Sequence, residues 1–181
     1  MEFDRIYAEV DLGRIEENMK AMKEHLRAGT KMYGVVKTDA YGHGAVPVAR
    51  TIDRFVCGYA VATVDEGIKL RRHGIEKEIL CLGPVSAGRY QECLENDISL
   101  PMFEYRRAKE LSDAAVAEGK TAKIHIAVDT GMSRIGFADV PESVETIKKI
   151  AALPNVEIEG MFTHFARADE TDRSPAITQL N

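Results

Sequence analysis

Apolar residues along the chain recur in two alternating patterns, one typical of short buried strands and the other of amphipathic helices. The first stretch, residues 11–27, has apolar residues three and four positions apart, which predicts one helix face with Asp11 as its cap. Apolar runs predict strands at 32–37, 59–64, 78–83, 98–103, 123–128 and 156–163. Helical spacing between them predicts helices at 44–55, 65–73, 86–95, 104–118 and 141–152.

This alternation predicts an α/β fold with a parallel sheet built from about six βα units. Two architectures fit the pattern, an open doubly wound sheet and part of a (β/α)8 barrel, and the pattern alone leaves both open. Near the end of the chain, Ser174 and Pro175 are suited to the start of another helix. A helix that begins so late leads us to expect a truncated piece of a longer protein.

Composition and charge exclude several classes of function. The chain has 181 residues, of which 45% are hydrophobic and 29% are charged, as expected for one globular domain. Its formal net charge is −5, and no basic tract predicts a nucleic-acid interface. No signal peptide or membrane-spanning run is visible. The cysteines at 57, 81 and 93 form no CxxC pair, which predicts reduced thiols in a cytoplasmic protein.

Polar and glycine-rich segments follow four of the predicted strands. In both parallel architectures, functional groups gather beyond the carboxyl ends of the strands. After the first strand come Lys37, Asp39, Tyr41 and His43. The third strand leads to "LGP" (82–84), the fifth to "DTGMSRIG" (129–136) and the sixth to "THF" (163–165). We therefore expect these segments on one rim of the sheet.

Three side chains on this rim have both a structural and a chemical interpretation. Lys37 is either a lysine that extends from a strand end into solvent or an amine suited to a Schiff base with a carbonyl cofactor. Arg134 is either a surface ion-pair partner or a ligand for an anionic oxygen. His164 is either a core histidine hydrogen-bonded to a neighbour or a catalytic or ring-stacking residue.

Other common chemistries lack their sequence motifs. "YGHG" at 41–44 is not a dinucleotide-binding GxGxxG, and it predicts a tight turn more strongly than a phosphate loop. The chain contains no GxxxxGK[ST], and no HExxH or paired CxxC that would predict a metal site. It also lacks the GxSxG of serine hydrolases.

The rim segments, in their order and spacing, carry a family resemblance. "VVKTDAYGHG", "VDTGMSRIG" and "FTHFA" closely resemble the amino-terminal domain of alanine racemases, and "AEVDLGRIEENMK" resembles that family's opening strand and helix. The resemblance covers essentially all of residues 1–181. It implies a (β/α)8 TIM-type barrel, incomplete here, that binds pyridoxal 5′-phosphate. The mostly β carboxyl-terminal domain of the family would be absent from this chain.

The resemblance implies a role for each of five residues. Lys37 would form the Schiff base with the cofactor and act as one of two catalytic bases. Tyr41 would contact the cofactor phosphate, and Leu82 would line the pocket near the ring. Arg134 would hydrogen-bond the phenolic oxygen of the cofactor and help to position the substrate carboxylate. His164 would pack against the pyridine ring.

The same resemblance implies the function of the parent protein. It would interconvert L- and D-alanine for peptidoglycan precursors in the bacterial cytoplasm, as a homodimer. The second base, a tyrosine in the carboxyl-terminal domain of the partner subunit, would lie outside this chain, so we expect the fragment alone to be inactive or nearly so. Alternatives are a racemase of serine or lysine, a non-catalytic pyridoxal-phosphate homeostasis protein, and a structural fragment without cofactor.

Two positions depart from the family pattern. Ala127 stands where some members carry a modified lysine, so Arg134 must be held by something else. Ser133 stands where the commoner motif "GMGR" has glycine, a modest change at a position where we expect sensitivity of the loop conformation.

Overall fold

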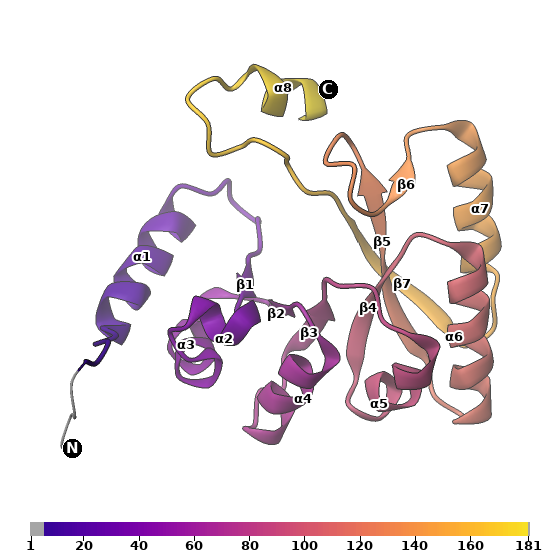
Figure 1. The fold of residues 1–181 in the computed structure, drawn as a ribbon, viewed down its shortest axis with the longest axis horizontal. Coiled ribbons are helices and arrows are strands. Elements are labelled where there is room, and N and C mark those ends of the chain that lie inside the picture. Colours follow the sequence, from indigo (N-terminus) through magenta and orange to yellow (C-terminus); the bar gives the residue numbers. More distant parts are fainter. Residues whose placement is uncertain (1–5, 181) are drawn as a thin grey trace. The chain divides into compact units, whose positions relative to one another are not determined.

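The computed structural model describes residues 6–180 (Figure 1). These residues form two compact units, which divide between Ile79 and Leu80. Each unit is built from strands followed by helices. The predicted alternation of strands and helices is confirmed, with element ends that differ by a few residues. No helix of the described residues is both long enough and apolar enough to cross a bilayer.

The first unit pairs its first two strands in parallel. Its elements are α1 (Leu12–Glu24), β1 (Tyr33–Val35), α2 (Lys37–Tyr41), α3 (Ala45–Ile52), the 3-10 turn η1 (Asp53–Phe55), β2 (Gly58–Val61) and α4 (Val64–Arg72). Tyr33 of β1 lies opposite Gly58 of β2, and the register continues to Val35 opposite Ala60. The strand β3 (Glu78–Cys81) begins at the end of this unit.

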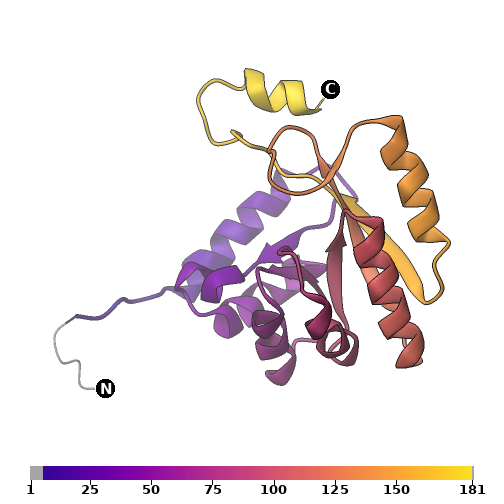
Figure 2. The same ribbon diagram turned by 45° about the vertical axis from the view of Figure 1, so that its right-hand side comes forward.

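The second unit is organised around one long central strand. Its elements are η2 (Ala87–Arg89), α5 (Tyr90–Glu95), β4 (Ile98–Met102), α6 (Tyr105–Ala117), β5 (Ala122–Asp129), β6 (Phe137–Ala138), α7 (Pro141–Ala151), β7 (Val156–Phe162) and α8 (Ser174–Leu180). β5 pairs in parallel with β4, with β7 and, at its carboxyl end, with β6. α6 and α7 lie side by side and pack against this part of the sheet (Figures 1 and 2).

The helix starts predicted near the two ends of the chain are confirmed, whereas the opening strand is not formed over the described residues. Asp11 caps α1, because its carboxylate accepts the N–H of Arg14 at 3.1 Å. The predicted late helix is α8, which begins at Ser174 with Pro175 in its first turn. The opening strand that the resemblance implies is not formed over residues 6–11, and residues 1–5 lie outside the described part of the chain. The short elements α2 and β6 were not predicted.

The core of the first unit closes around Tyr59, which is fully buried. Its hydroxyl is 2.7 Å from the carbonyl oxygen of Ala49 and 2.8 Å from Oδ1 of Asp53, so the buried polar atom is satisfied. Burial, followed by the contact with Asp53, raises the pKa of this phenol. A Cβ at Gly34 would lie 2.7 Å from Cδ1 of Ile52 and 3.2 Å from the Tyr59 ring, so a larger residue there would need both side chains to shift. Tyr59 therefore joins β2 to α3 beneath β1.

We expect Tyr59→Phe to lower the free energy of unfolding by about 1–2 kcal/mol, because it removes the hydrogen bond that this buried hydroxyl donates to the Ala49 carbonyl or to the Asp53 carboxylate. Urea denaturation of the purified chain measures the change. Tyr105→Phe is the matched control: that tyrosine is 41% exposed, and its replacement should change stability by less than about 0.5 kcal/mol. Equal effects of the two substitutions would contradict a structural role for the Tyr59 hydroxyl.

Candidate active site

Lys37 is the first residue of α2, which is a left-handed turn and not a regular right-handed helix. The next four residues, Thr38 to Tyr41, all have φ between 53° and 55°. None of the four is glycine, and for other L-residues this conformation costs about 1–2 kcal/mol each and normally occurs singly. A run of four is therefore a strained segment that its surroundings must impose. The predicted strand ends two residues earlier than expected, at Val35, so Lys37 belongs to this turn and not to the strand.

The turn places an amine beside a phenol. The Nζ atom of Lys37 lies 5.8 Å from the centre of the Tyr41 ring, within the range of a cation–π contact. Lys37 is half-buried, whereas Tyr41 is 62% exposed. Within residues 6–180, neither the Lys37 ammonium nor the Tyr41 hydroxyl has a hydrogen-bond or ion-pair partner. Both polar groups are available to a ligand.

Backbone hydrogen bonds fix both ends of the turn. The N–H of Val36, which is fully buried, donates to the carbonyl of Ala60 at 2.9 Å and extends the pairing of β1 with β2. The N–H of Ala40 then returns to the carbonyl of Val36 at 2.9 Å. Gly42 and Gly44 continue with φ of 86° and 89°, values that glycine adopts without strain. "YGHG" is thus a tight turn that leads into α3, as predicted.

Asp39 is a structural ligand of the turn. Its Oδ1 accepts a hydrogen bond from the N–H of Ala45, the first residue of α3, at 3.0 Å and another from Lys69 Nζ at 2.8 Å. The hydrogen bond from Ala45, and then the one from Lys69, hold the pKa of Asp39 below its usual value. The sequence placed Asp39 among the candidate polar groups, but the structure commits its carboxylate to the backbone of α3.

In the second unit, a carboxylate also organises the loop that carries Arg134. Oδ1 of Asp129 accepts the N–H groups of Ser133 and Gly131 at 2.9 and 3.0 Å, and these bonds lower the pKa of the carboxyl. At the far end of the loop, Gly136 has φ of 130°. A Cβ there would lie 2.4 Å from the backbone nitrogen of Asp129, so only glycine fits. The loop is closed at both ends.

Arg134 projects from this closed loop with an exposed side chain. No hydrogen bond or ion pair to another described residue engages its guanidinium, so the surface ion-pair interpretation does not hold. Ala127 is 1% exposed in β5. Leu82, the remaining apolar candidate of this unit, is half-buried directly after β3.

His164 lies in the loop after β7, the strand next to β5. The side chain is exposed, so the core-histidine interpretation is wrong. Its carbonyl accepts from Gln179 Nε2 at 3.3 Å, and the same amide lies 3.1 Å from Oγ1 of Thr130. The hydroxyls of Thr130 and Thr163 lie 2.7 Å apart. Gln179 of α8, which the sequence did not single out, therefore ties together the loops that carry Arg134 and His164.

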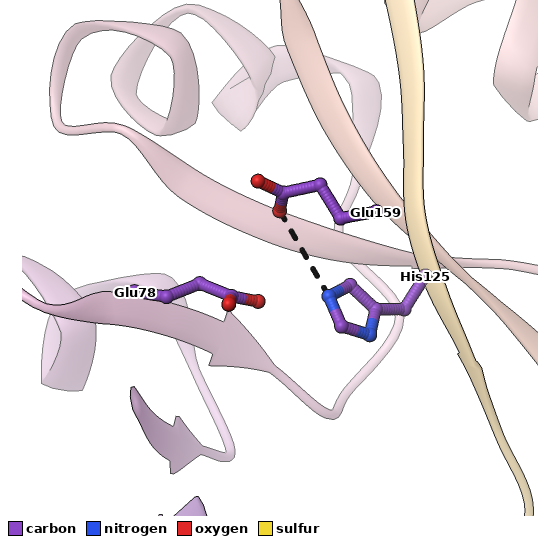
Figure 3. Close-up of side chains that lie close together, drawn as sticks. All are labelled: Glu78, His125 and Glu159. Atoms are coloured by element: carbon purple, nitrogen blue, oxygen red, sulfur yellow. Dashed lines mark ion pairs between the residues drawn. The ribbon is translucent and has the colours of Figure 1, made fainter. Parts of the chain in front are cut away.

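A second polar cluster lies in the middle of the strands, away from their carboxyl ends (Figure 3). His125 Nε2 of β5 is 3.8 Å from a carboxylate oxygen of Glu159 on β7, and Ser99 of β4 donates to the same oxygen at 2.7 Å. A side chain at Gly160 would come within 2.9 Å of the His125 ring. The pairing register of β5 and β7 shifts next to His125. This cluster joins three strands and was not predicted.

Comparison with known proteins places the chain in a family. Residues 10–181 match the model of the family described as alanine racemase, N-terminal domain. The chain belongs to this family. It is 46% identical over 177 residues to an alanine racemase of Clostridium novyi, covering 97% of this chain and 46% of that protein. The chain spans about half the length of the curated relatives it matches.

Solved structures of the family share the fold. An alanine racemase of Clostridium difficile 630 matches with a TM-score of 0.92 and 38% identity, over 95% of this chain and 45% of that one. A histidine racemase of Leuconostoc mesenteroides subsp. sake matches with a TM-score of 0.86 and 26% identity, over 93% of this chain and 45% of that one. The predicted α/β class, an incomplete parallel (β/α)8-type barrel, is confirmed. The roles of Lys37, Tyr41, Leu82, Arg134 and His164 remain predictions.

We expect the loop after β5 to tolerate Ser133→Gly but not Gly136→Ala. Ser133 has a φ of 55°, so glycine at this position relieves a backbone strain of about 1 kcal/mol. The greater conformational freedom of glycine in the unfolded chain offsets this gain, so stability should change little. Alanine at Gly136 meets the backbone of Asp129 and should cost about 2 kcal/mol or more. Urea denaturation measures both changes. Gly136→Ala with the stability of the parent chain would contradict the closed-loop geometry.

Proposed function

We propose that this chain is the cofactor-binding part of a pyridoxal-phosphate-dependent amino-acid racemase, with Lys37 as the residue that holds the cofactor covalently. The observation that carries the proposal is the ammonium of Lys37, which has no hydrogen-bond or ion-pair partner among residues 6–180 and stands beside Tyr41 on a strained turn. Backbone strain of this kind concentrates at functional sites. Membership of the racemase family supports the same reaction class.

The candidate residues fit the cofactor in chemical kind. Pyridoxal phosphate presents an aldehyde, a phosphate, a phenolic oxygen and an apolar ring. For these groups the chain offers the amine of Lys37, the hydroxyl of Tyr41, the guanidinium of Arg134 and the ring of His164, with Leu82 as an apolar contact. None of the four polar side chains has a hydrogen-bond or ion-pair partner elsewhere in the described chain.

Each residue then has a defined task. When bound, the cofactor spreads into its ring the negative charge that develops at the α-carbon of an amino acid. The Lys37 amine, once its nitrogen is free, accepts or returns the α-proton on one face. Arg134 keeps a permanent positive charge, which suits a carboxylate or a phenolic oxygen. Tyr41 donates a hydrogen bond to a phosphate oxygen.

The finer assignment is alanine as the substrate. The names of relatives at 40–46% identity support it, and the resemblance further supports peptidoglycan precursor supply, a cytoplasmic location and a homodimer for the parent protein. The histidine racemase with the same fold favours a second candidate, racemisation of another amino acid. Because one base serves only one face of the α-carbon, this chain alone is proposed to be inactive or nearly so.

Covalent trapping tests the proposal. The full chain is mixed with pyridoxal 5′-phosphate, reduced with borohydride and digested, and the modified peptide is identified by mass. We expect one cofactor per chain, on Lys37, because this amine is held next to Tyr41 and has no competing ion pair. Lys37→Ala should abolish the adduct, whereas the control Lys31→Ala, at an exposed lysine, should leave it unchanged. Adducts spread equally over surface lysines would refute the assignment.

A further inference from the structure

Helix α4 reaches the strained turn with two side chains of opposite charge. Oε1 of Glu66 accepts the N–H of Thr38 at 2.7 Å, across 28 residues of sequence. Three residues further along the same helix, Lys69 Nζ donates to Oδ1 of Asp39 at 2.8 Å. Positions three apart share a helix face. The turn after β1 is therefore held by the helix of the following βα unit.

The two carboxylate oxygens of Glu66 accept hydrogen bonds from two different loops. Its backbone N–H donates to Oγ1 of Thr63 at 3.3 Å, and its Oε2 accepts the N–H of Thr63 at 3.4 Å, which together form the capping box of α4. The same Oε2 accepts the N–H of Ala62 at 2.7 Å. A capping box uses the carboxylate only at the start of its own helix, so the bond from Oε1 to Thr38 is an additional link.

The two contacts of α4 differ in strength. The side chains of Lys69 and Asp39 are 50% and 52% exposed, and half-exposed ion pairs contribute little. The bond from Thr38 to Glu66 joins a backbone N–H to a carboxylate in a short and directional contact. This N–H belongs to the peptide group that directly follows the α-carbon of Lys37. Glu66 therefore fixes the orientation of the chain as it leaves Lys37.

Building on the proposed function, we propose that Glu66 is the positioning residue for Lys37. Its carboxylate holds the peptide group between Lys37 and Thr38, so that the amine of Lys37 and the ring of Tyr41 stay on the same side of the turn for pyridoxal phosphate. Glu66 acts through the backbone, and Lys69 makes only a minor contribution. No proton transfer by Glu66 is involved.

Four variants of the full chain separate positioning from helix capping. Glu66→Ala removes the bond to Thr38 together with the bonds from the N–H groups of Ala62 and Thr63. Thr63→Ala removes the other half of the capping box, the bond from the Glu66 N–H to Oγ1, and leaves the Glu66 carboxylate in place. Lys69→Met removes only the ion pair to Asp39. Glu66→Gln keeps one acceptor oxygen and should fall between Glu66→Ala and the parent chain, which provides a reading even where Glu66→Ala folds poorly.

The first measurement needs no cofactor. We expect Glu66→Ala to speed amide hydrogen exchange at Thr38 and Ala40 by about ten- to hundredfold, the loss of one charge-assisted hydrogen bond. Thr63→Ala and Lys69→Met should change exchange at these amides by less than about fivefold. An exchange rate in Glu66→Ala that equals that in Thr63→Ala would show that Glu66 only caps α4, and it would overturn the proposal.

The second measurement is the rate at which borohydride traps pyridoxal 5′-phosphate on Lys37. We expect Glu66→Ala to slow it about tenfold and the two controls to stay near the parent rate. Unchanged trapping in Glu66→Ala, despite faster exchange, would also overturn the positioning role. If the parent chain itself forms no adduct on Lys37, the proposed function fails, whereas the exchange data still report whether Glu66 holds the turn.

Discussion

The left-handed run from Thr38 to Tyr41 is the constraint on which the rest of the first unit depends. At about 1–2 kcal/mol for each residue, its conformation costs roughly 4–8 kcal/mol. That cost is similar to the whole net stability of a small domain, roughly 5–15 kcal/mol. The run persists because neighbouring elements bond to it from three directions: β2 through Val36, α3 through Ala45 and α4 through Glu66. This destabilising conformation holds the Lys37 amine and the Tyr41 phenol side by side.

The second unit uses the same chemical device in a different loop. Asp129, at the end of β5, accepts the N–H groups of Gly131 and Ser133, much as Asp39 accepts the N–H of Ala45 after β1. Backbone donors beyond a strand end have lost their ladder partners and must be satisfied in another way. Carboxylates meet this need and leave Lys37 and Arg134 without an ion-pair partner among residues 6–180. The anionic residues shape the loops, and these two cationic side chains remain available.

The sequence predicts elements well and long-range contacts poorly, and the turn after β1 shows why. Strands and helices are readable because their apolar periods differ, and the rule about carboxyl strand ends singled out Lys37 and its loop. The left-handed conformation was not predicted because Thr, Ala and Tyr disfavour it, and a single Asp is too weak a signal for a run of four residues. The information lies in Glu66, 28 residues away, and a capping-box glutamate gives no hint of a second partner. The link from Thr130 to Gln179 spans 49 residues and was equally invisible.

A different limit applies to the pair of His125 and Glu159. An acidic residue in a strand with alternating exposure normally faces solvent, so the pattern predicted nothing at Glu159. Its carboxylate instead meets a buried imidazole and the hydroxyl of Ser99. Gly160 makes room for the ring, because a Cβ there would lie 2.9 Å from His125. A glycine in a strand was thus the one readable sign of close packing at this point.

The two departures from the family pattern bear on how Arg134 works. With alanine at 127, that position supplies no polar group, and the guanidinium is held by no other residue of the described chain. Ser133 accepts a left-handed φ of 55° because its N–H bonds to Asp129, so the backbone next to Arg134 is fixed without glycine. Order therefore resides in the loop and not in the side chain. A ligand that engages Arg134 must itself order that side chain, at a cost of about 0.5–1.5 kcal/mol that a preformed guanidinium would avoid.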